Sequence, residues 1–403
     1  MNQKSDRNES KFIIDRWIHG ITEYQFQIFG LFLLLIFSVL IRIHLAPFCD
    51  LSPDYNTYYK EWVNQYRNVG FWNGLGQTIG DYYVPMNILY GIASLFPFEP
   101  WVLISFFSCL FEYIGVYFLY KIAVFLGTGK IKAAYAAVLV LFIPCSIFDS
   151  ALWKQCDSIY VCFAIISIYY LLKDKYNAAL IFLGISLSFK LQAIFLLPLF
   201  VVVYLIKKNY SILSFLWLPI VYVVAGLPSV FAGRGIKATY LTYLLQTQEG
   251  TTESYGMNSF FPNIYALGLD NYYDELAIPA ILITVAILGL IILLVIRNKQ
   301  LFDGKMLIST AIWMAWTCCM FLPGMHERYD YLVLVLMVVA AFVIDKKYFV
   351  PMIVINFCSL ITYTITLFKT ETVPLEVTTV IYIGTYTIFF AYLVRKVMYT
   401  KSV

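Results

Sequence analysis

Long apolar runs alternate with short polar breaks along almost the whole chain. Each run has the length of a helix rather than the ten-residue alternation of a membrane β-strand, so the pattern predicts an all-α polytopic membrane protein. We expect about twelve transmembrane segments, within a range of eleven to thirteen, although several are shorter than the roughly 20 residues of a full crossing. The predicted segments are 25–45, 101–122, 132–148, 158–172, 177–189, 191–206, 212–231, 276–296, 305–322, 330–344, 348–368 and 376–395.

The polar breaks between these runs alternate in character. One set is rich in Lys and Arg, and the positive-inside rule places it, with both chain termini, in the cytoplasm. That set comprises 4–16, 121–132, 173–175, 207–208, 297–305, 346–347 and 395–401. The other set holds most of the Asp, Gln, Asn, Trp and Tyr placed for chemistry, which predicts an extracytoplasmic functional face. It comprises 46–100, 149–157, 190, 232–275, 323–329 and 369–375.

The first outer loop, 46–100, is long enough to contain helices of its own. If 46–83 is outside and 121–132 inside, only one crossing fits between them, so the short run 84–97 is predicted to be a helix within the loop. The chain 1–403 is then a single integral membrane domain with a second long outer loop at 232–275. The polar N-terminus has no small-residue cleavage site, so we expect no cleaved signal peptide.

Composition narrows the class of protein. The chain is 61% hydrophobic and 13% charged, whereas soluble domains average about 45–50% and about 25%. A cytosolic enzyme, a nucleic-acid binder and a disordered scaffold are therefore excluded. The net charge of +4 is modest and sits in short loops, which indicates topology rather than nucleic-acid affinity. The eight Cys lack zinc or haem spacing and are predicted to be small buried hydrophobes.

The first outer loop offers a carboxylate beside aromatic rings. Pro53 can start a helix with Ser52 at its cap and Asp54 in its first turn. Tyr58 and Trp62 follow Asp54 at i+4 and i+8 and would share its helix face. An interfacial helix contributing to the aromatic belt explains the same pattern. Further along the loop, residues 81–83 form a second acidic and aromatic turn, which begins with Asp81.

Two further polar positions interrupt the apolar runs. The second outer loop carries Trp153, Gln155 and Asp157 between two predicted spans, although Asp157 is also placed to cap a helix. Lys190 lies within about a dozen mostly apolar residues on either side. A lysine at mid-membrane depth costs about 2.5–3.5 kcal/mol, so it persists where it faces water, protein or an anionic ligand. Snorkelling of Lys190 to the interface is the alternative.

The strongest local signal is the polar turn 323–330. His326, Glu327 and Arg328 are three consecutive ionisable residues between two apolar runs, which favours a functional role. A Glu–Arg pair that satisfies itself is the alternative. The loop 232–275 adds Arg234, and a loop of this length is predicted to be a lid or an acceptor-binding surface.

Five of these segments resemble the GT-C superfamily of polytopic glycosyltransferases, in particular bacterial relatives of the second GPI mannosyltransferase. They occur in the family's order through most of the chain. Lys154 stands where members often carry Gly. The segments are PDYNTYYKEW (53–62), GDYYVP (80–85), WKQCDSIY (153–160), FKLQAIFLLP (189–198) and MHERYDYL (325–332).

The resemblance implies transfer of one hexose, of the mannose or glucose type, from a polyprenyl-phosphate donor to a glycan or glycolipid acceptor. The family's general base maps onto Asp54, with Asp50 as a nearby alternative, because an attacking hydroxyl must lose its proton. A single displacement implies inversion at the anomeric carbon. The sequence has no tight Asp-x-Asp pair, so we expect the reaction to need no metal. Cations suit the departing phosphate; the candidates are Lys190, Arg328, His326 and Arg234. Candidates for the donor-sugar pocket are Asp157, Gln155, Gln192, Trp153, Asp81, Glu327 and Tyr55.

Two other functions remain open at this point. A transporter or flippase for lipid-linked sugars also has many helices and intramembrane charges, but its charges should lie near mid-membrane. A glycan polymerase or ligase that uses a polyprenyl-diphosphate oligosaccharide should carry more Arg in its large outer loops. The polar groups collect at one membrane face, which favours the single-sugar transferase in a plasma membrane, most plausibly bacterial. Its partners would be the lipid-linked donor, the acceptor and membrane lipids, with no cofactor.

Overall fold

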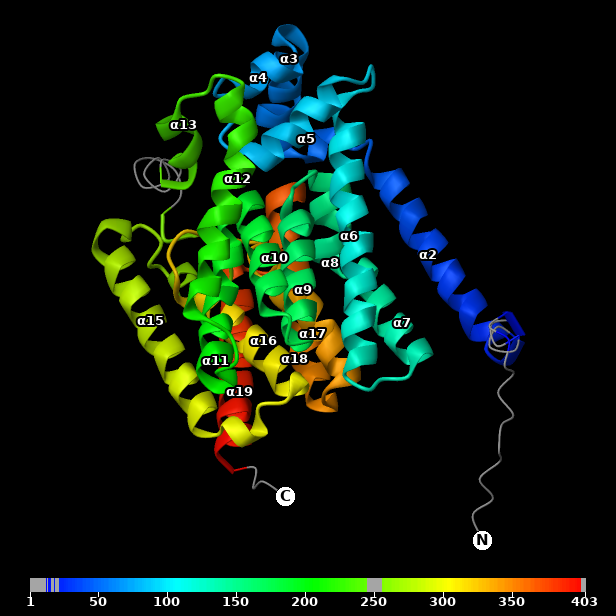
Figure 1. The fold of residues 1–403 in the computed structure, drawn as a ribbon, viewed down its shortest axis with the longest axis vertical. Helices are drawn as coiled ribbons and strands as arrows, with labels where there is room; N and C mark the ends of the chain where they lie inside the picture. The colour runs from blue at the N-terminus through cyan, green and yellow to red at the C-terminus, as the bar shows by residue number, and fades with distance from the viewer. Residues whose placement is uncertain (1–11, 13, 16–17, 19–21, 245–255, 400–403) are drawn as a thin grey trace.

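The computed structural model describes residues 12, 14–15, 18, 22–244 and 256–399. The basic ends 4–16 and 395–401, which predicted cytoplasmic termini, and the predicted outer loop 232–275 lie partly outside these residues. Within them the fold is almost entirely helical (Figure 1). The all-α class predicted from the apolar runs is confirmed.

The longer helices overlap the predicted apolar runs, except α3 and α5, which lie in the predicted first outer loop. They are α2 Gln25–Leu45, α3 Lys60–Val69, α5 Val84–Ser94, α6 Pro100–Phe125, α7 Lys130–Leu139, α9 Asp157–Leu172, α10 Tyr176–Phe189, α11 Leu197–Lys207, α12 Trp217–Phe231, α15 Tyr273–Arg297, α16 Gly304–Phe321, α17 Tyr331–Val343, α18 Phe349–Phe368 and α19 Leu375–Tyr399. Three helices are short: α4 Phe71–Leu75, α8 Pro144–Ile147 and α13 Ile236–Tyr240.

Irregular helical turns and one small sheet complete the described structure. The 3₁₀ turns are η1 Cys49–Leu51, η3 Val140–Phe142, η5 Leu191–Leu196, η6 Ile212–Leu216, η7 Ile264–Ala266, η8 Lys299–Leu301 and η9 Lys346–Tyr348, and the π-helical turns are η2 Tyr55–Tyr59 and η4 Phe148–Trp153. Strands β1 Asn258–Ser259 and β2 Met325–His326 pair in parallel.

Seven described helices are long and apolar enough to cross a membrane, or eight if one bent pair forms a single span. Twelve crossings are therefore not shown. Four predicted spans form helices shorter than this criterion: 157–172, 176–189, 191–207 and 331–343. Two of these, α9 and α17, are buried along nearly their whole length. A helix that is apolar on every side is typical of a bundle interior, and protein neighbours rather than lipid surround these two.

The predicted span 132–148 is broken at Pro144. Proline lacks a backbone N–H and forces the preceding residue into extended backbone, and Ile143 has ψ 151°. The helix axis bends by 63° there, and the chain continues as α8 and η4 as far as Trp153. Residues 149–157, predicted as an outer loop, are therefore entirely buried, since the bend turns them into the bundle.

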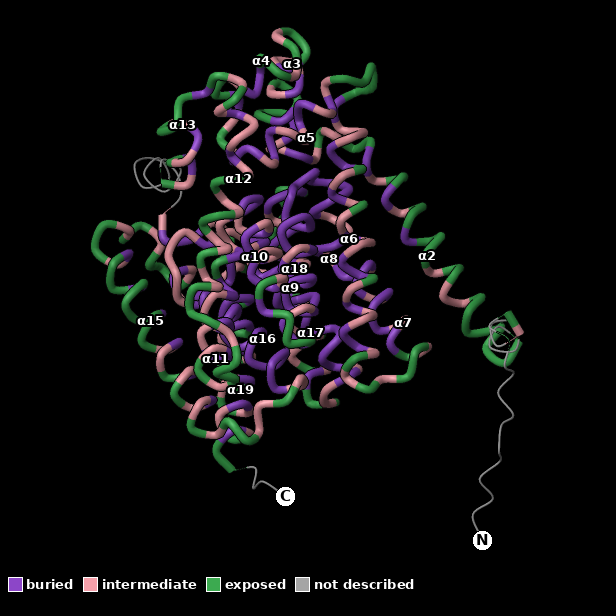
Figure 2. Tube along the Cα trace, in the orientation of Figure 1, coloured by how far each residue is buried: buried purple, intermediate pink, exposed green. Residues whose placement is uncertain are grey.

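Helices α3, α4 and α5 form a layer over one end of the bundle (Figure 1). The helix predicted within 84–97 is present as α5. Figure 2 shows that burial concentrates in the middle of the bundle, while α2 and α15 are largely exposed along their lengths. Exposed apolar side chains on helices long enough to cross a membrane are what a lipid-facing surface requires.

Candidate functional site

The Asp54 side chain is held by two donors from the distant residues 153–155. Its Oδ2 accepts a hydrogen bond from Trp153 Nε1 at 2.8 Å and another from Gln155 Nε2. Within the described residues, Oδ1 makes no hydrogen bond. Ser52 ties the two segments together, because its Oγ accepts from Tyr55 N at 3.3 Å, as predicted for a cap, and donates to the Trp153 carbonyl at 2.5 Å.

Of the predicted helix face shared by Asp54, Tyr58 and Trp62, the contact between Tyr58 and Trp62 is present, with ring centres 5.7 Å apart, but Asp54 is directed elsewhere. Residues 55–59 make a π-helical turn, which is wider than an α-turn and shifts the register of the following side chains. The Asp54 carboxylate turns to Trp153 instead. The Trp62 ring is partly buried within an aromatic cluster, so it is not an open platform. Its ring neighbours are Tyr58, Tyr59, Tyr82 and Tyr90.

Hydrogen bonds orient the amide of Gln155 from its other side. Tyr82 Oη donates to Gln155 Oε1 at 3.3 Å, and the hydroxyls of Tyr82 and Tyr59 are 3.1 Å apart. The Gln155 backbone carbonyl accepts from Ser108 Oγ at 2.5 Å. Because Oε1 is occupied by a donor, Nε2 is the atom that faces Asp54. The two tyrosines therefore set the direction in which Gln155 presents its amide.

Asp157 is the shared partner of two buried cations. Its Oδ1 lies 2.7 Å from Lys190 Nζ, and its Oδ2 lies 3.2 Å from Arg328 Nε. Arg328 also pairs through Nη1 with Glu327 Oε1 at 2.7 Å, which is the Glu–Arg pair considered above. All four side chains are at most 10% exposed. The alternative of Asp157 as a simple helix cap does not describe this arrangement, since both of its oxygens face cations.

Aromatic faces cover the two cations. The guanidinium of Arg328 lies 4.8 Å from the centre of the Trp153 ring, and Lys190 Nζ lies 5.2 Å from that of Tyr329. Cation–π contacts of this kind are stronger away from water. Trp153 therefore contacts both halves of the site, since its N–H reaches Asp54 and its face carries Arg328.

The pKa shifts of Arg328 and Glu327 reflect the charged groups that lie near them. Burial alone would lower the pKa of Arg328, but the charges of Glu327, Asp157 and Asp54 raise it. Burial raises the pKa of Glu327, and the hydrogen-bonded Arg328 opposes that rise. Asp54 thus lies close enough to act on Arg328 although the structure records no ion pair between them among the described residues. A carboxylate and a guanidinium face the same site from different segments.

A small parallel sheet positions the turn that carries His326. Strand β1 pairs Asn258 with Met325 and Ser259 with His326, and the backbone N–H of Glu327 donates to the Ser259 carbonyl at 3.1 Å. The described end of the long loop 232–275 is therefore part of the site's framework. Whether this loop also acts as a lid or binds an acceptor stays a prediction.

His326 differs in charge from its cationic neighbours. Its Nδ1 lies 4.0 Å from Glu327 Oε2, and its ring contacts Tyr329 at 5.0 Å. Burial lowers the pKa of His326 well below its ordinary value, and the positive charges of Arg328 and Lys190 add to that effect. His326 is therefore a neutral imidazole near neutral pH. In this state it suits hydrogen bonding to a phosphate better than charge pairing.

Several predicted site residues are not joined to these contacts. Arg234 is buried beside Tyr66 and Tyr83, and burial lowers its pKa. Asp50 and Asp81 are exposed, on η1 and on the turn before α5. The described residues give no ion pair or hydrogen bond linking Arg234 or Asp50 to Asp157 or Arg328, so their roles stay predictions.

Two further predicted residues lie beside the site. Gln192 follows Lys190 by two positions on η5, and its buried Oε1 has no hydrogen-bond partner among the described residues. Tyr55 is buried, with the ammonium of Lys154 at 5.7 Å from its ring centre. Gln192 has an acceptor available for a ligand, whereas Tyr55 packs beneath the Asp54 segment.

Lys154 adopts a backbone conformation that is usual for glycine. Its φ is 66°, a left-handed conformation that glycine adopts without strain. The side chain is fully buried, and Nζ donates to the Leu152 carbonyl at 2.8 Å. Burial lowers the pKa of Lys154 to about 8. The turn therefore places Trp153 and Gln155 on either side of a strained residue, with both side chains reaching Asp54.

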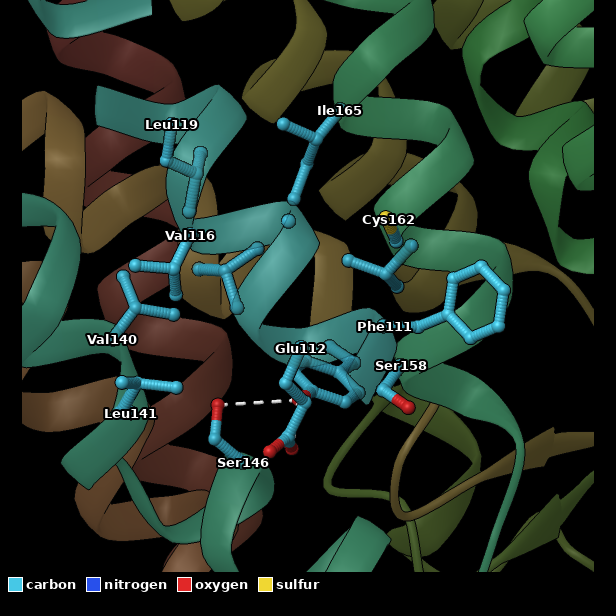
Figure 3. Close-up of a pocket in the computed structure, with 14 residues that line it drawn as sticks. Phe111, Glu112, Val116, Leu119, Val140, Leu141, Ser146, Ser158, Cys162 and Ile165 are labelled. Carbon is cyan, nitrogen blue, oxygen red and sulfur yellow. Dashed lines mark hydrogen bonds between the residues drawn. The ribbon is translucent and has the colours of Figure 1, made fainter. Parts of the chain in front are cut away.

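A second buried ion pair was not predicted from the sequence. Arg42 Nε lies 2.8 Å from Glu112 Oε2, and Glu112 Oε1 accepts from Tyr331 Oη at 2.9 Å. A cavity of about 20 Å³ adjoins it, enough for one water. Figure 3 shows Glu112 and Ser146 at one end of this cavity and Leu119 at the other. The signal was a charged residue inside each of two predicted spans, which is rare unless the charges pair.

Asp149 was also missed. It lies in the π-helical turn η4 with no exposed surface, and neither carboxyl oxygen has a hydrogen-bond partner among the described residues. Its strongest electrostatic neighbour is Asp157. The sequence offered only its place at the end of a predicted span, because the bend at Pro144 is what turns it inward.

The arrangement combines a carboxylate, one oxygen of which accepts no hydrogen bond from the part of the chain that the structure describes, with two cations that share one counter-ion. A carboxylate of this kind can accept a proton, and cations on aromatic faces can bind an anion. The segments around 54, 82, 154, 190 and 327, which are the five that carry the family resemblance, meet here. No protein-family model and no curated protein matches this chain.

Proposed function

We propose that this protein is a membrane glycosyltransferase that moves one hexose from a polyprenyl-phosphate donor to a glycan or glycolipid acceptor. The proposal includes a GT-C-like arrangement of about twelve segments, an extracytoplasmic site, and inverting transfer without a metal. It also includes cytoplasmic termini and a location in a bacterial plasma membrane. One observation carries it: Trp153 holds Asp54 with its N–H and Arg328 on its face.

Asp54 is the proposed general base. Its Oδ1 takes the proton of the acceptor hydroxyl as that oxygen bonds to the anomeric carbon of the donor sugar. The two donors on Oδ2 keep the carboxylate in one orientation. Positioning of this kind matters because a misplaced base loses much of its effect.

Lys190 and Arg328 are proposed to bind the leaving phosphate. The bond from the anomeric carbon to the phosphate oxygen breaks, and its electron pair stays on the polyprenyl phosphate. Arg328 uses Nε and Nη1 for Asp157 and Glu327, so its Nη2 is available, and Lys190 Nζ has donors beyond the one that Asp157 accepts. Preorganised cations stabilise developing negative charge without reorganising.

We propose that two groups complete the donor site: the neutral His326, and the Gln192 oxygen that no described residue hydrogen-bonds. An imidazole N–H can donate to a phosphate oxygen, and the Gln192 Oε1 can accept from a sugar hydroxyl. This assignment retains both residues of the sequence hypothesis but changes the role of His326 from cation to hydrogen-bond donor. Arg234 stands apart from this set.

The test is sugar transfer in proteoliposomes. Purified protein is given a panel of radiolabelled polyprenyl-phosphate sugars, with membrane extract as the source of acceptors. Label should move from one donor into a glycan or glycolipid, and the transfer should fall at least about a hundredfold in Asp54→Asn, as general-base loss predicts. Arg328→Ala should lose transfer to a similar extent.

Asp50→Asn is the matched control, because Asp50 is an exposed carboxylate four residues earlier in the same loop. It should transfer as the unmodified protein does, and loss of activity there in place of Asp54→Asn would reassign the base. Donors that cross the bilayer intact and equally in all variants would overturn the enzyme in favour of a flippase. Transfer only from a diphosphate-linked oligosaccharide would favour the polymerase class.

A further inference from the structure

A basic hollow lies beside the C-terminal end of α19. This end of α19 lies at the opposite end of the bundle from the layer of α3, α4 and α5 (Figure 1). The hollow is open and has a volume of about 680 Å³. Its walls come from η9 and from one face of α19. The lining residues are Asp345, Lys347, Ile388, Ala391, Tyr392, Arg395, Lys396 and Tyr399.

Two ammonium groups of the hollow face the same aromatic ring. Lys347 Nζ lies 5.3 Å and Lys396 Nζ 5.9 Å from the centre of the Tyr392 ring. Arg395 is the neighbouring exposed residue on α19. The positive charges of these residues repel one another. An anion bound between them would therefore reduce this repulsion.

The one carboxylate that lines the hollow already accepts two hydrogen bonds. Asp345 Oδ2 accepts from Tyr392 Oη at 2.7 Å, and its Oδ1 accepts the backbone N–H of Lys347 at 3.0 Å. The described residues provide no ion pair to Lys347, Arg395 or Lys396. Three cations and one carboxylate line the hollow, so its formal net charge is +2.

The rest of the lining is apolar and faces outward. Ile388 is 73% exposed and lies two helical turns before Arg395 on the same side of α19. Helix α19 is long and apolar enough to cross a membrane. The hollow thus continues from cations at the helix end to an aliphatic surface along the helix. A free phosphate ion would use only the first part, whereas a lipid would use both.

We propose that this hollow binds the phosphate headgroup of an anionic phospholipid, with Lys347, Arg395 and Lys396 around the phosphate and Ile388 beside an acyl chain. Juxtamembrane basic residues attract anionic lipids electrostatically. The site is separate from the proposed transfer reaction and does not depend on it.

Native mass spectrometry of the full-length chain in detergent tests the site, with phosphatidylglycerol as the probe and phosphatidylcholine as the neutral lipid. One phosphatidylglycerol should bind at least about tenfold more tightly than phosphatidylcholine. The triple variant Lys347→Gln, Arg395→Gln, Lys396→Gln should lose that preference by about tenfold. The matched control is Lys130→Gln, Lys132→Gln, Lys208→Gln, which removes as much charge from exposed basic residues outside the hollow and should keep the preference.

Asp345→Asn provides a test of opposite sign if the triple variant does not fold. Asparagine retains a side-chain acceptor for the Lys347 N–H but removes the competing charge, so phosphatidylglycerol should bind several-fold more tightly. Equal binding by the triple variant and the unmodified protein would overturn the site, as would an equal loss in the control. Displacement of the lipid by inorganic phosphate at equal concentration would reassign the hollow to a free anion.

Discussion

The indole of Trp153 carries the guanidinium of Arg328 on its face at 4.8 Å. The same indole donates its N–H to Asp54 at 2.8 Å. A single buried side chain therefore joins the proposed base to one of the proposed phosphate-binding cations. Because Trp153 reaches this place through the bend at Pro144 and the π-helical turn η4, the geometry of the site depends on an irregular stretch of backbone.

Trp153→Phe separates the two functions of the indole. Phenylalanine keeps an aromatic face for Arg328 but cannot donate to Asp54, and a hydrogen bond to a charged group contributes about 1.5–3 kcal/mol. We expect transfer to slow at least about tenfold with donor affinity little changed, as steady-state kinetics would measure. Trp313→Phe is the control, because Trp313 is buried with Nε1 unpartnered among the described residues. Equal losses in the two variants would contradict the assignment.

Asp157→Asn leaves two buried cations without their shared counter-ion. Removing one partner of a buried ion pair typically costs about 3–5 kcal/mol, so the melting temperature in detergent should fall by several degrees. Polyprenyl phosphate should restore part of it by binding the freed Lys190 and Arg328. Asp303→Asn, which keeps an acceptor for the Met306 N–H, should melt normally. The proposed role of Asp157 would be refuted if the lipid phosphate failed to stabilise the Asp157 variant.

Acid should destabilise the protein through His326. Burial and the neighbouring cations lower the pKa of His326 well below 6.5 in the folded state, so below about pH 6.5 the unfolded chain binds a proton that the folded one does not. Stability from this residue is present above that pH and is lost as the pH falls. The melting temperature of His326→Asn should fall less between pH 7 and 5 than that of the unmodified protein, where the pH values are rough bounds. Parallel curves would show that His326 does not titrate in this way.

Base should stabilise the protein through Lys154. Its pKa is about 8 in the folded state and 10.5 ordinarily, so between these values only the unfolded chain holds the proton and stability rises with pH. Lys154→Met keeps the side-chain length and the backbone strain but has no proton to lose. The difference in melting temperature between variant and unmodified protein should shrink from pH 8 to pH 10.5. A difference independent of pH would mean that Lys154 keeps its ordinary pKa.

Glu112→Gln should destabilise the protein by about 3–5 kcal/mol, because Arg42 would be left buried beside a neutral amide. Replacing both residues, as Arg42→Met with Glu112→Leu, should cost much less, since well-packed apolar side chains often substitute for a buried pair. Tyr331→Phe removes one neutral donor to Glu112 and should cost about 1–3 kcal/mol. Denaturation of the three variants in one detergent compares these values. A double variant no more stable than Glu112→Gln would argue that the pair is not coupled.

The sequence alone determined the class of protein and the location of its helices. A run of apolar residues must form a helix in lipid because the backbone has no other hydrogen-bond partners, and each predicted run is largely helical in the structure. The cost of a charged group beside hydrocarbon also made Lys190 and Arg328 candidates, whereas Asp54 and Asp157 became candidates through the family resemblance. Which runs cross the membrane was less certain, because a buried helix such as α17 and a lipid-facing helix such as α15 are both apolar.

Only the tertiary structure decided which of these polar groups meet. Asp54 and Trp153 are nearly a hundred residues apart, and their contact requires the bend at Pro144 to turn residues 149–157 into the bundle. The backbone at 55–59 is likewise a π-helical turn rather than the regular helix assumed from the spacing, and Asp54 turns to Trp153 while Tyr58 and Trp62 stay in contact. Hydrophobic periodicity follows regular backbone, so it locates helices well. The catalytic candidates lie where the backbone is irregular, and there packing between distant segments sets the direction of each side chain.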